Sequence, residues 1–139
     1  MKTPIRTAVP LLFAAAVLIT ASCSRGLQNP QLAKFNNDAN NLIMGLQQYK
    51  EFTGAYPTGE NPEIAKALLG QNEKKVLILA VRKSDLSAKG EILDPWGTPL
   101  QFYFSRNGVL LRSAGPNQVF EDDLASRSDD LFRTEVPAE

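Results

Sequence analysis

The clearest pattern in the chain is a stripe of apolar residues at steps of three and four positions between residues 32 and 52. Its members are Leu32, Phe35, Ala39, Leu42, Ile43, Leu46 and Tyr49. This spacing places them on one face of an α-helix, whereas the opposite face is rich in asparagine and glutamine. The pattern predicts a long amphipathic helix from Leu32 to Phe52, which Gly54 ends.

Shorter apolar runs follow this helix and are separated by turn-forming residues. They cover residues 76–81, 100–105 and 109–113. The last two predict a β-hairpin because Asn107-Gly108 stands between them, and the first is typical of a buried strand, although its periodicity also fits a helix. Asn61-Pro62-Glu63 predicts a short helix with asparagine as its N-cap. These elements indicate an α+β fold with the long N-terminal amphipathic helix packed on a small antiparallel sheet.

The N-terminus has the pattern of a secretory signal peptide over residues 1–22. Two basic residues, an apolar run and three small residues precede the cysteine: Lys2 and Arg6, residues 11–19, residues 20–22, and Cys23. A charged start, a short apolar centre and a small-residue exit are the three parts of such a peptide. The apolar run is shorter than the ~20 residues that a membrane-spanning helix needs.

Cys23 is the only cysteine, and it ends the segment Thr20-Ala21-Ser22-Cys23, which resembles a bacterial lipobox. We interpret Cys23 as a lipidation site because an unpaired thiol is otherwise unusual in an exported protein. The alternative is cleavage that leaves a free thiol. Similarity to lipoproteins, with serine after the cysteine, implies a periplasmic protein that is lipid-anchored to the outer membrane. Residues 23–31 are interpreted as a tether, and residues 32–139 as the globular domain.

The composition narrows the classes of function. The chain has 15 basic and 15 acidic residues, and 13 basic and 15 acidic residues remain after residue 22. This slightly acidic part offers no basic patch for phosphates, so nucleic acid is not an expected partner. There is no histidine, which removes the commonest general base and metal ligand. Adjacent acids such as Asp122-Asp123 point apart in an extended chain, so we expect no catalytic residues and no enzymatic activity.

Three segments carry a resemblance to a known family. They are residues 49–58 (YKEFTGAYPT), residues 94–99 (DPWGTP) and residues 113–117 (SAGPN), the last followed by acids that end in Asp129-Asp130-Leu131. In this order they resemble the soluble domain of the major pseudopilin of type II secretion, over residues 32–131. The resemblance implies the α+β fold described above.

The turn residues in these segments have physical reasons of their own. They are Gly54, Pro57, Asp94, Pro95, Trp96 and Gly97. Proline and glycine force a tight turn after Asp94, whose carboxylate can accept hydrogen bonds from the turn backbone. Trp96 offers a large apolar face that can cover one end of the core. We therefore interpret these residues as structural and not as catalytic.

The resemblance also implies a calcium-binding loop after the hairpin. The candidate ligands are Ser113, Asn117, Asp122, Asp123, Asp129 and Asp130, with Glu121 among them. Calcium takes about six to eight oxygen ligands, which such a loop can offer. The alternative is a solvated acidic loop, as most charge runs are. Residues 114–139 as a whole are expected to be loop-like.

As to function, the resemblance implies a non-enzymatic structural or assembly protein of type II secretion or a related pilus-like apparatus. Its partners would be other pseudopilins or secretion-system proteins, with the membrane reached through the lipid anchor. The chain departs from the family at the N-terminus, where its first acid is Asp38 and no apolar helix carries an early glutamate. The alternative is a free-standing periplasmic lipoprotein, a binding or scaffold module that retains only the fold.

Overall fold

The structure is a computed structural model that describes residues 29–106, 108–122 and 129–135. The predicted signal peptide, Cys23, Asn107 and Asp123 lie outside the described residues. The elements run in the order of two helices, a short 3-10 turn and three strands. The strands form a small antiparallel sheet, so the predicted α+β class is confirmed.

Helix α1 spans Pro30–Thr53 and contains the predicted amphipathic stripe. At its start the Asn29 side chain accepts a hydrogen bond from the N–H of Gln31 at 3.0 Å. At its end the left-handed φ of 91° at Gly54 lets this residue donate its N–H to the Lys50 carbonyl at 2.7 Å. The helix begins two residues earlier than predicted, inside the predicted tether. No helix in the described part of the chain is both long and apolar enough to cross a membrane.

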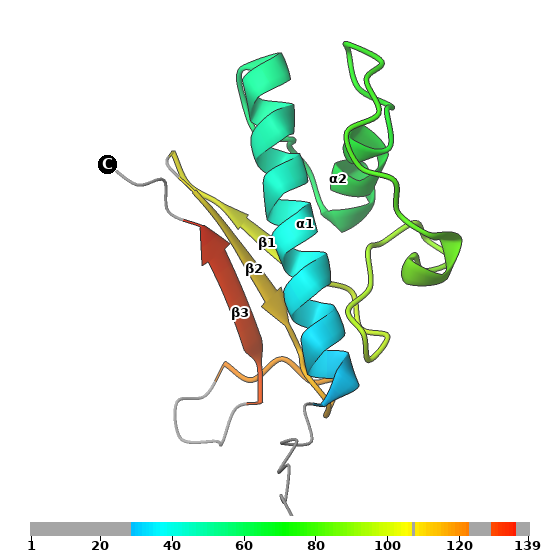
Figure 1. Cartoon of the computed structure of the whole chain (residues 1–139), viewed down its shortest axis with the longest axis vertical. Coiled ribbons are helices and arrows are strands. Elements are labelled where there is room, and N and C mark those ends of the chain that lie inside the picture. Colours follow the sequence, from blue (N-terminus) through cyan, green and yellow to red (C-terminus); the bar gives the residue numbers. More distant parts are fainter. Residues whose placement is uncertain (1–28, 107, 123–128, 136–139) are drawn as a thin grey trace, which may run out of the picture.

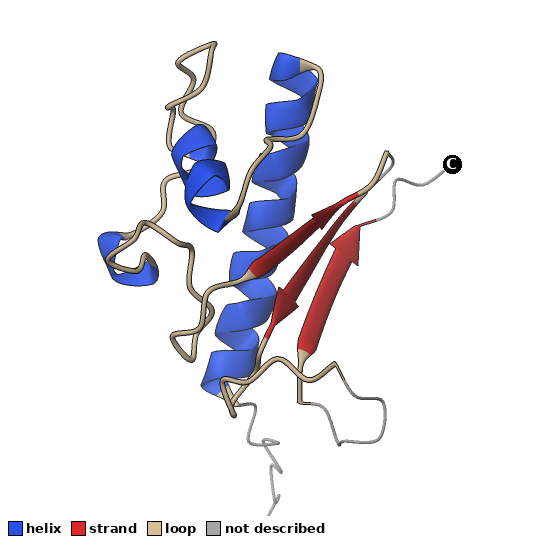
Figure 2. Cartoon of the chain, turned by 180° about the vertical axis from the view of Figure 1, so that it is seen from behind, coloured by secondary structure: helices blue, strands red, loops and turns tan. Residues whose placement is uncertain are grey.

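The sheet lies on one side of α1, and helix α2 lies on the other (Figures 1 and 2). The elements are α2 (Asn61–Leu68), β1 (Gln101–Phe104), β2 (Val109–Ser113) and β3 (Leu131–Glu135). Strand β2 is central, because Leu111 pairs with Phe102 of β1 on one side and with Arg133 of β3 on the other. Side chains alternate along a strand, so Leu111 faces the core and its neighbour Arg112 faces away from it.

One core joins the helices and the sheet. It contains Phe35, Ala39, Leu42, Ile43 and Leu46 of α1, Ile64, Ala65 and Leu68 of α2, and Ile92, Leu100, Val109 and Leu111. Each fully buried leucine or isoleucine contributes about 1.5–3 kcal/mol by leaving water. The apolar stripe of α1 is thus held against α2 and the sheet, because tertiary packing supplies most helical stability.

The prediction of a strand at residues 76–81 is wrong, because this segment joins no sheet. The N–H groups of Ile78 and Leu79 both donate to the Leu68 carbonyl at the end of α2, at 2.9 and 3.1 Å. Their side chains pack beside Gly45 of α1, where an added Cβ would lie 3.6 Å from Leu79. These contacts cover part of the apolar run without placing a neighbouring strand along it.

Two further expectations need correction. Residues 114–139 were expected to be loop-like, but β3 lies within them and completes the sheet. Asn61 was expected to be an N-cap, but Glu60 takes that position and Asn61 begins α2. The Asn61 side chain instead bonds to the Ile92 N–H at 2.6 Å and to the Leu100 carbonyl at 2.7 Å. It therefore ties the start of α2 to the segment that leads into β1.

Candidate functional site

The site begins with a turn at residues 94–98, which is organised by a buried carboxylate. Asp94 is 5% exposed, and its Oδ1 accepts hydrogen bonds from the N–H groups of Trp96 at 3.0 Å and Thr98 at 2.8 Å. Gly97 has a left-handed φ of 94°, a backbone conformation that costs free energy in any residue with a side chain. Because its hydrogen bonds lie within the turn and at the end of β2, Asp94 has a structural role here.

The second oxygen of Asp94 joins this turn to the end of β2. Ser113 is fully buried, and its hydroxyl donates to Asp94 Oδ2 at 2.7 Å while it accepts the Gly115 N–H at 3.1 Å. The Gln118 side chain adds a second link, since it donates to the Trp96 carbonyl at 2.9 Å. Two segments that carry the family resemblance, residues 94–99 and 113–117, are therefore one structural unit.

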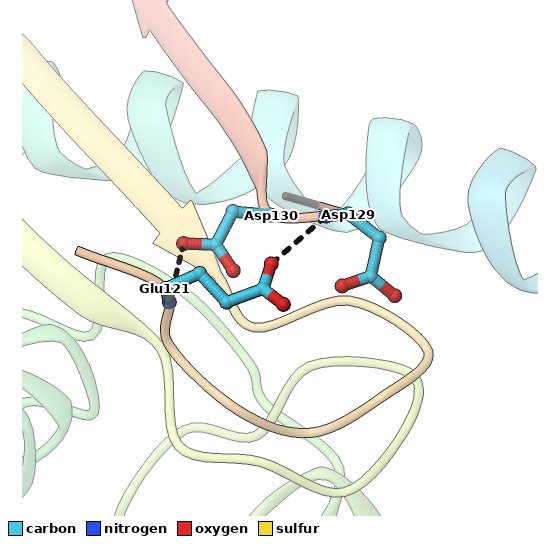
Figure 3. A group of neighbouring side chains, drawn as sticks. All are labelled: Glu121, Asp129 and Asp130. Carbon is cyan, nitrogen blue, oxygen red and sulfur yellow. Dashed lines mark hydrogen bonds between the residues drawn. The ribbon is translucent and has the colours of Figure 1, made fainter. Parts of the chain in front are cut away.

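Three carboxylates meet beside this unit. One oxygen from each of Glu121, Asp129 and Asp130 lies within 4.8 Å of the others, and Figure 3 shows the Glu121 carboxylate between the two aspartates. Glu121 Oε2 accepts the Asp129 N–H at 3.1 Å, and the Glu121 N–H donates to Asp130 Oδ2 at 3.4 Å. The two ends of the loop are thus held together by their own backbone and acidic side chains.

Arg112 of β2 provides a positive charge at the same place. Its Nε donates to Asp130 Oδ2 at 2.6 Å, and its other nitrogens reach Asp122 Oδ1 and the Glu121 carbonyl, both at 2.9 Å. The hydrogen bond to Asp122, followed by those to Asp130 and Tyr103, raises the pKa of Arg112 despite its burial. The Asp130 side chain is fully buried whereas that of Asp122 is 86% exposed, so water screens the pair with Asp122 far more than the pair with Asp130.

Asn117 and Gly115 shape the loop around Asp129. The Asn117 N–H donates to Asp129 Oδ2 at 3.1 Å, and its side-chain amide donates to Glu121 Oε1 at 3.0 Å. A Cβ added at Gly115 would lie only 2.3 Å from the Asp129 carbonyl oxygen, so glycine is required there. Asp129 Oδ1 is buried and has no hydrogen-bond partner among the described residues.

The arrangement offers the chemistry of a hard cation site. Carboxylate oxygens converge from Glu121, Asp129 and Asp130, with the Asn117 side chain beside them, and carboxylate oxygens are ligands that calcium prefers. Asp129 Oδ1, which has no partner among the described residues, is the atom that would gain most from a cation, because leaving a buried oxygen without a hydrogen bond costs free energy. The donor types present therefore fit calcium at these residues.

The predicted ligands do not all gather at this place. Ser113 points to the Asp94 turn, and Asp122 extends outward to Arg112, while Asp129, Asp130 and Asn117 lie at the cluster. Sequence reasoning did not identify Arg112. Its signal was the alternation in β2, which turns Arg112 away from the core and towards the acidic loop.

The first segment of the resemblance lies at the other end of the sheet. Pro57 is buried, and the Tyr56 ring stacks on Phe104 with centroids 5.2 Å apart. Lys50 lies 4.6 Å from the Tyr56 ring and donates to the Arg106 carbonyl, so this segment closes the hairpin end of the sheet.

Comparisons with protein-family models, with curated proteins and with solved structures each gave no match.

Proposed function

We propose that this chain is a non-enzymatic, pseudopilin-like structural or assembly protein of a type II secretion system or a related pilus-like apparatus. The observation that carries the proposal is the contact of Ser113 with Asp94 at 2.7 Å. It joins the two most distinctive segments of the resemblance into one unit beside the acidic loop. The long helix α1, packed on a small antiparallel sheet, supports the same proposal.

The acidic loop has a supporting part in this proposal. Glu121, Asp129 and Asp130, with Asn117, would hold calcium and lock the loop before β3. Bound calcium would supply positive charge that cross-links the two ends of the loop. Arg112 already neutralises Asp130 and Asp122, so Asp129 and Glu121 are the acids that would gain most from the ion.

The proposed place of the protein is the periplasm. Export through the signal peptide and lipidation of Cys23 would anchor the domain to the outer membrane, with the part of the predicted tether (residues 23–31) that precedes α1 as the link. Its partners would be other pseudopilins or proteins of the secretion apparatus. The domain would meet these partners as a tethered module.

A free-standing periplasmic lipoprotein with a binding or scaffold role is the second candidate. The observation that favours it is the open apolar stretch at residues 76–82, where several backbone groups make no hydrogen bond within the described structure. A stretch of this kind can bind a partner that is not a pilus subunit as well as one that is. The fold alone does not decide between the two candidates.

Cross-linking in the producing cells separates the two candidates. The full chain, cross-linked and purified in mild detergent, is expected to bring down pseudopilins or the secretin, which mass spectrometry would identify. Recovery of the chain as a monomer without any of them would overturn the assembly proposal and leave the scaffold role.

Calcium titration of the full chain tests the loop. A ligand that binds only the native state stabilises it by about 2.7 kcal/mol at a hundredfold excess over Kd. Each kcal/mol corresponds to a rise in melting temperature of about 4 °C or more in a small domain. Asp129→Asn should remove the rise, and the control Glu51→Gln, at an exposed acid of α1, should keep it. An unchanged melting temperature in millimolar calcium would show that the loop is a solvated acidic surface.

A further inference from the structure

The stretch of residues 76–82, between α2 and the 3-10 turn at Lys83–Asp85, has a largely unpaired backbone. Within the described structure, the N–H groups of Leu77, Ala80, Val81 and Arg82 make no hydrogen bond, and neither do the carbonyls of residues 77–81. Arg82 has the extended backbone angles of φ −70° and ψ 145°. Backbone donors and acceptors are therefore available along one stretch of chain.

The side chains of this stretch are apolar and only partly covered. Leu77 is 62% exposed, whereas Ile78 and Leu79 are partly buried against the core. A cavity of about 150 Å³ lies beside the stretch, with an apolar wall of Leu42, Leu79, Ala80, Val81, Ile92 and Leu93 and a polar wall of Asp38, Asn41, Arg82 and Asp85. A cavity of this volume has room for a small aliphatic group against its apolar wall.

Positive charge flanks the apolar stretch at both ends. Lys74 and Lys75 precede it, Arg82 ends it, Lys83 follows it, and all four residues are exposed. Residues 73–85 contain only two acids, Glu73 and Asp85, against these four bases. Asp85 lies 3.2 Å from Arg82 and 3.4 Å from Lys34, so it is already shared between two cations. The ends of the stretch therefore attract carboxylates.

We propose that residues 76–82 bind an extended peptide segment of a partner protein by strand addition, and that this segment has a small-aliphatic centre and acidic ends. The backbone groups that have no partner in the described structure would pair with an extended peptide, as in other strand-addition complexes. The cavity takes one side chain of the added strand, and the flanking cations select its acidic ends. This inference does not rest on the pseudopilin-like role, because it uses residues on the opposite side of α1 from the acidic loop (Figure 1). It deepens the second candidate function, a lipoprotein with a binding role.

A second copy of the chain is a poorer occupant. If two copies paired through residues 76–82, the basic ends would face each other in both the parallel and the antiparallel arrangement, and like charges placed opposite each other oppose pairing. A lipid bilayer is also a poorer occupant. Its hydrocarbon would cover the backbone groups of Ala80 and Val81 without bonding to them, which is costly. A polypeptide satisfies both the charges and the backbone.

The test uses the full chain in mild detergent and a fluorescein-labelled peptide of alternating valine and threonine with two aspartates at each end. Fluorescence anisotropy should show saturable binding, with a Kd below about 1 mM. The same peptide with lysines at its ends should bind about tenfold more weakly or not at all. Equal binding of both peptides, or binding of neither, would overturn the proposal.

Two further measurements separate strand addition from simple apolar adhesion. N-methylation of alternate residues removes the donors on one edge of the peptide, so methylation of one set should abolish binding while the other set keeps it. Lys74→Glu should weaken binding about fivefold, and the control Lys89→Glu, at an exposed lysine elsewhere, should not. Equal tolerance of both methylated sets would rule out a backbone ladder.

Vesicles and self-association complete the test. Flotation with phosphatidylglycerol vesicles, using the chain without its first 23 residues as a comparison, reports binding to lipid that is independent of the anchor. Loss of vesicle binding in Lys74→Glu, with no peptide binding, would assign the stretch to a membrane instead. A dimer in analytical ultracentrifugation that Leu77→Asp dissolves would assign it to a second copy.

Discussion

Strand β2 and residues 76–81 are apolar runs of similar composition that reach different structures. Strand β2 has a hydrogen-bonded neighbour on each side, and Val109 and Leu111 are buried against the helices. Residues 76–81 have no neighbouring strand in the part of the chain that the structure describes, and Leu77 is 62% exposed. The difference teaches that strand propensity describes a fit to a pleated, half-buried surface, whereas the ladder itself depends on partners far away in the sequence.

The two runs also differ in what their polar residues do. In β2, Arg112 and Ser113 reach the acidic loop and the Asp94 turn, so one strand connects three parts of the domain. At the end of the other run, nearby Asp85 is the only partner of the Arg82 side chain among the described residues. We therefore expect β2 to contribute to the stability of the fold and residues 76–81 to be available to bind a partner.

Truncation of one leucine in each run should give the largest contrast. Leu111→Ala leaves a cavity beneath the sheet, which costs about 2–5 kcal/mol of unfolding free energy. Leu77→Ala removes a mostly exposed side chain and should cost about 0.5 kcal/mol or less. Urea unfolding followed by circular dichroism measures both. Equal losses at the two positions would mean that residues 76–81 are packed as tightly as β2, and the comparison would fail.

The Asp94 turn should show the next largest effect, because it anchors the end of β2. Asp94→Ala leaves the Trp96 N–H, the Thr98 N–H and the Ser113 hydroxyl without their acceptor, at a cost of about 3 kcal/mol. Asp94→Asn keeps one carbonyl oxygen for the two N–H groups and should cost about 1 kcal/mol. The same urea measurement applies. A cost for asparagine as large as that for alanine would mean that the negative charge, and not hydrogen-bond geometry, holds the turn.

The local elements of the fold could be predicted from the sequence. The stripe from Leu32 to Tyr49 located α1, and Asn107-Gly108 between two apolar runs located β1 and β2. Strand β3 could not be predicted, because residues 131–135 contain charged residues and their strand form depends on pairing with β2. The wrong prediction of a strand at residues 76–81 has the same cause, because this run favours a strand but no described strand pairs with it.

The candidate site could be predicted in its residue types but not in its geometry. The sequence placed oxygen-rich side chains after β2, and Asp129 and Asp130 do meet Glu121. It could not place Ser113 on Asp94 or Arg112 on Asp130, because both contacts join residues that are 18 or 19 positions apart and depend on how the loop folds back. Long-range side-chain contacts of this kind have no local pattern.

A smaller loss of unfolding free energy is expected at Gly115, where the loop passes close to the Asp129 backbone just before β3. Gly115→Ala places a methyl group 2.3 Å from the Asp129 carbonyl and forces a φ of 68° on alanine, at a cost of about 2 kcal/mol. Gly90→Ala is the matched control, because Gly90 also has a positive φ, 83°, but no atom within 4 Å of an added Cβ. It should cost about 1 kcal/mol. Equal costs at the two glycines would show that the loop moves away from Asp129 at little expense.

The smallest effect concerns the ion pairs that tie residues 82–85 to α1. Burial lowers the pKa of Lys34, but the hydrogen bond and charge of Asp38, assisted by Asp85, outweigh it and raise the pKa above its ordinary value. Because the pKa is raised in the folded state, the contribution of charged Lys34 to the free energy of unfolding is fully present below the unfolded-state pKa. This contribution is lost as the pH rises through the folded-state pKa.

Lys34→Met should therefore cost about 0.5 kcal/mol at pH 7, since the pair is partly exposed. The difference from the unmodified chain should shrink as the pH rises towards and past the ordinary lysine pKa, in urea unfolding measured from pH 7 to pH 11. Ser84→Ala, at an exposed neutral position of the same turn, is the control and should show no such trend. A cost that stays constant with pH would mean that Lys34 acts through its aliphatic stem, and that packing rather than charge holds residues 82–85 against α1.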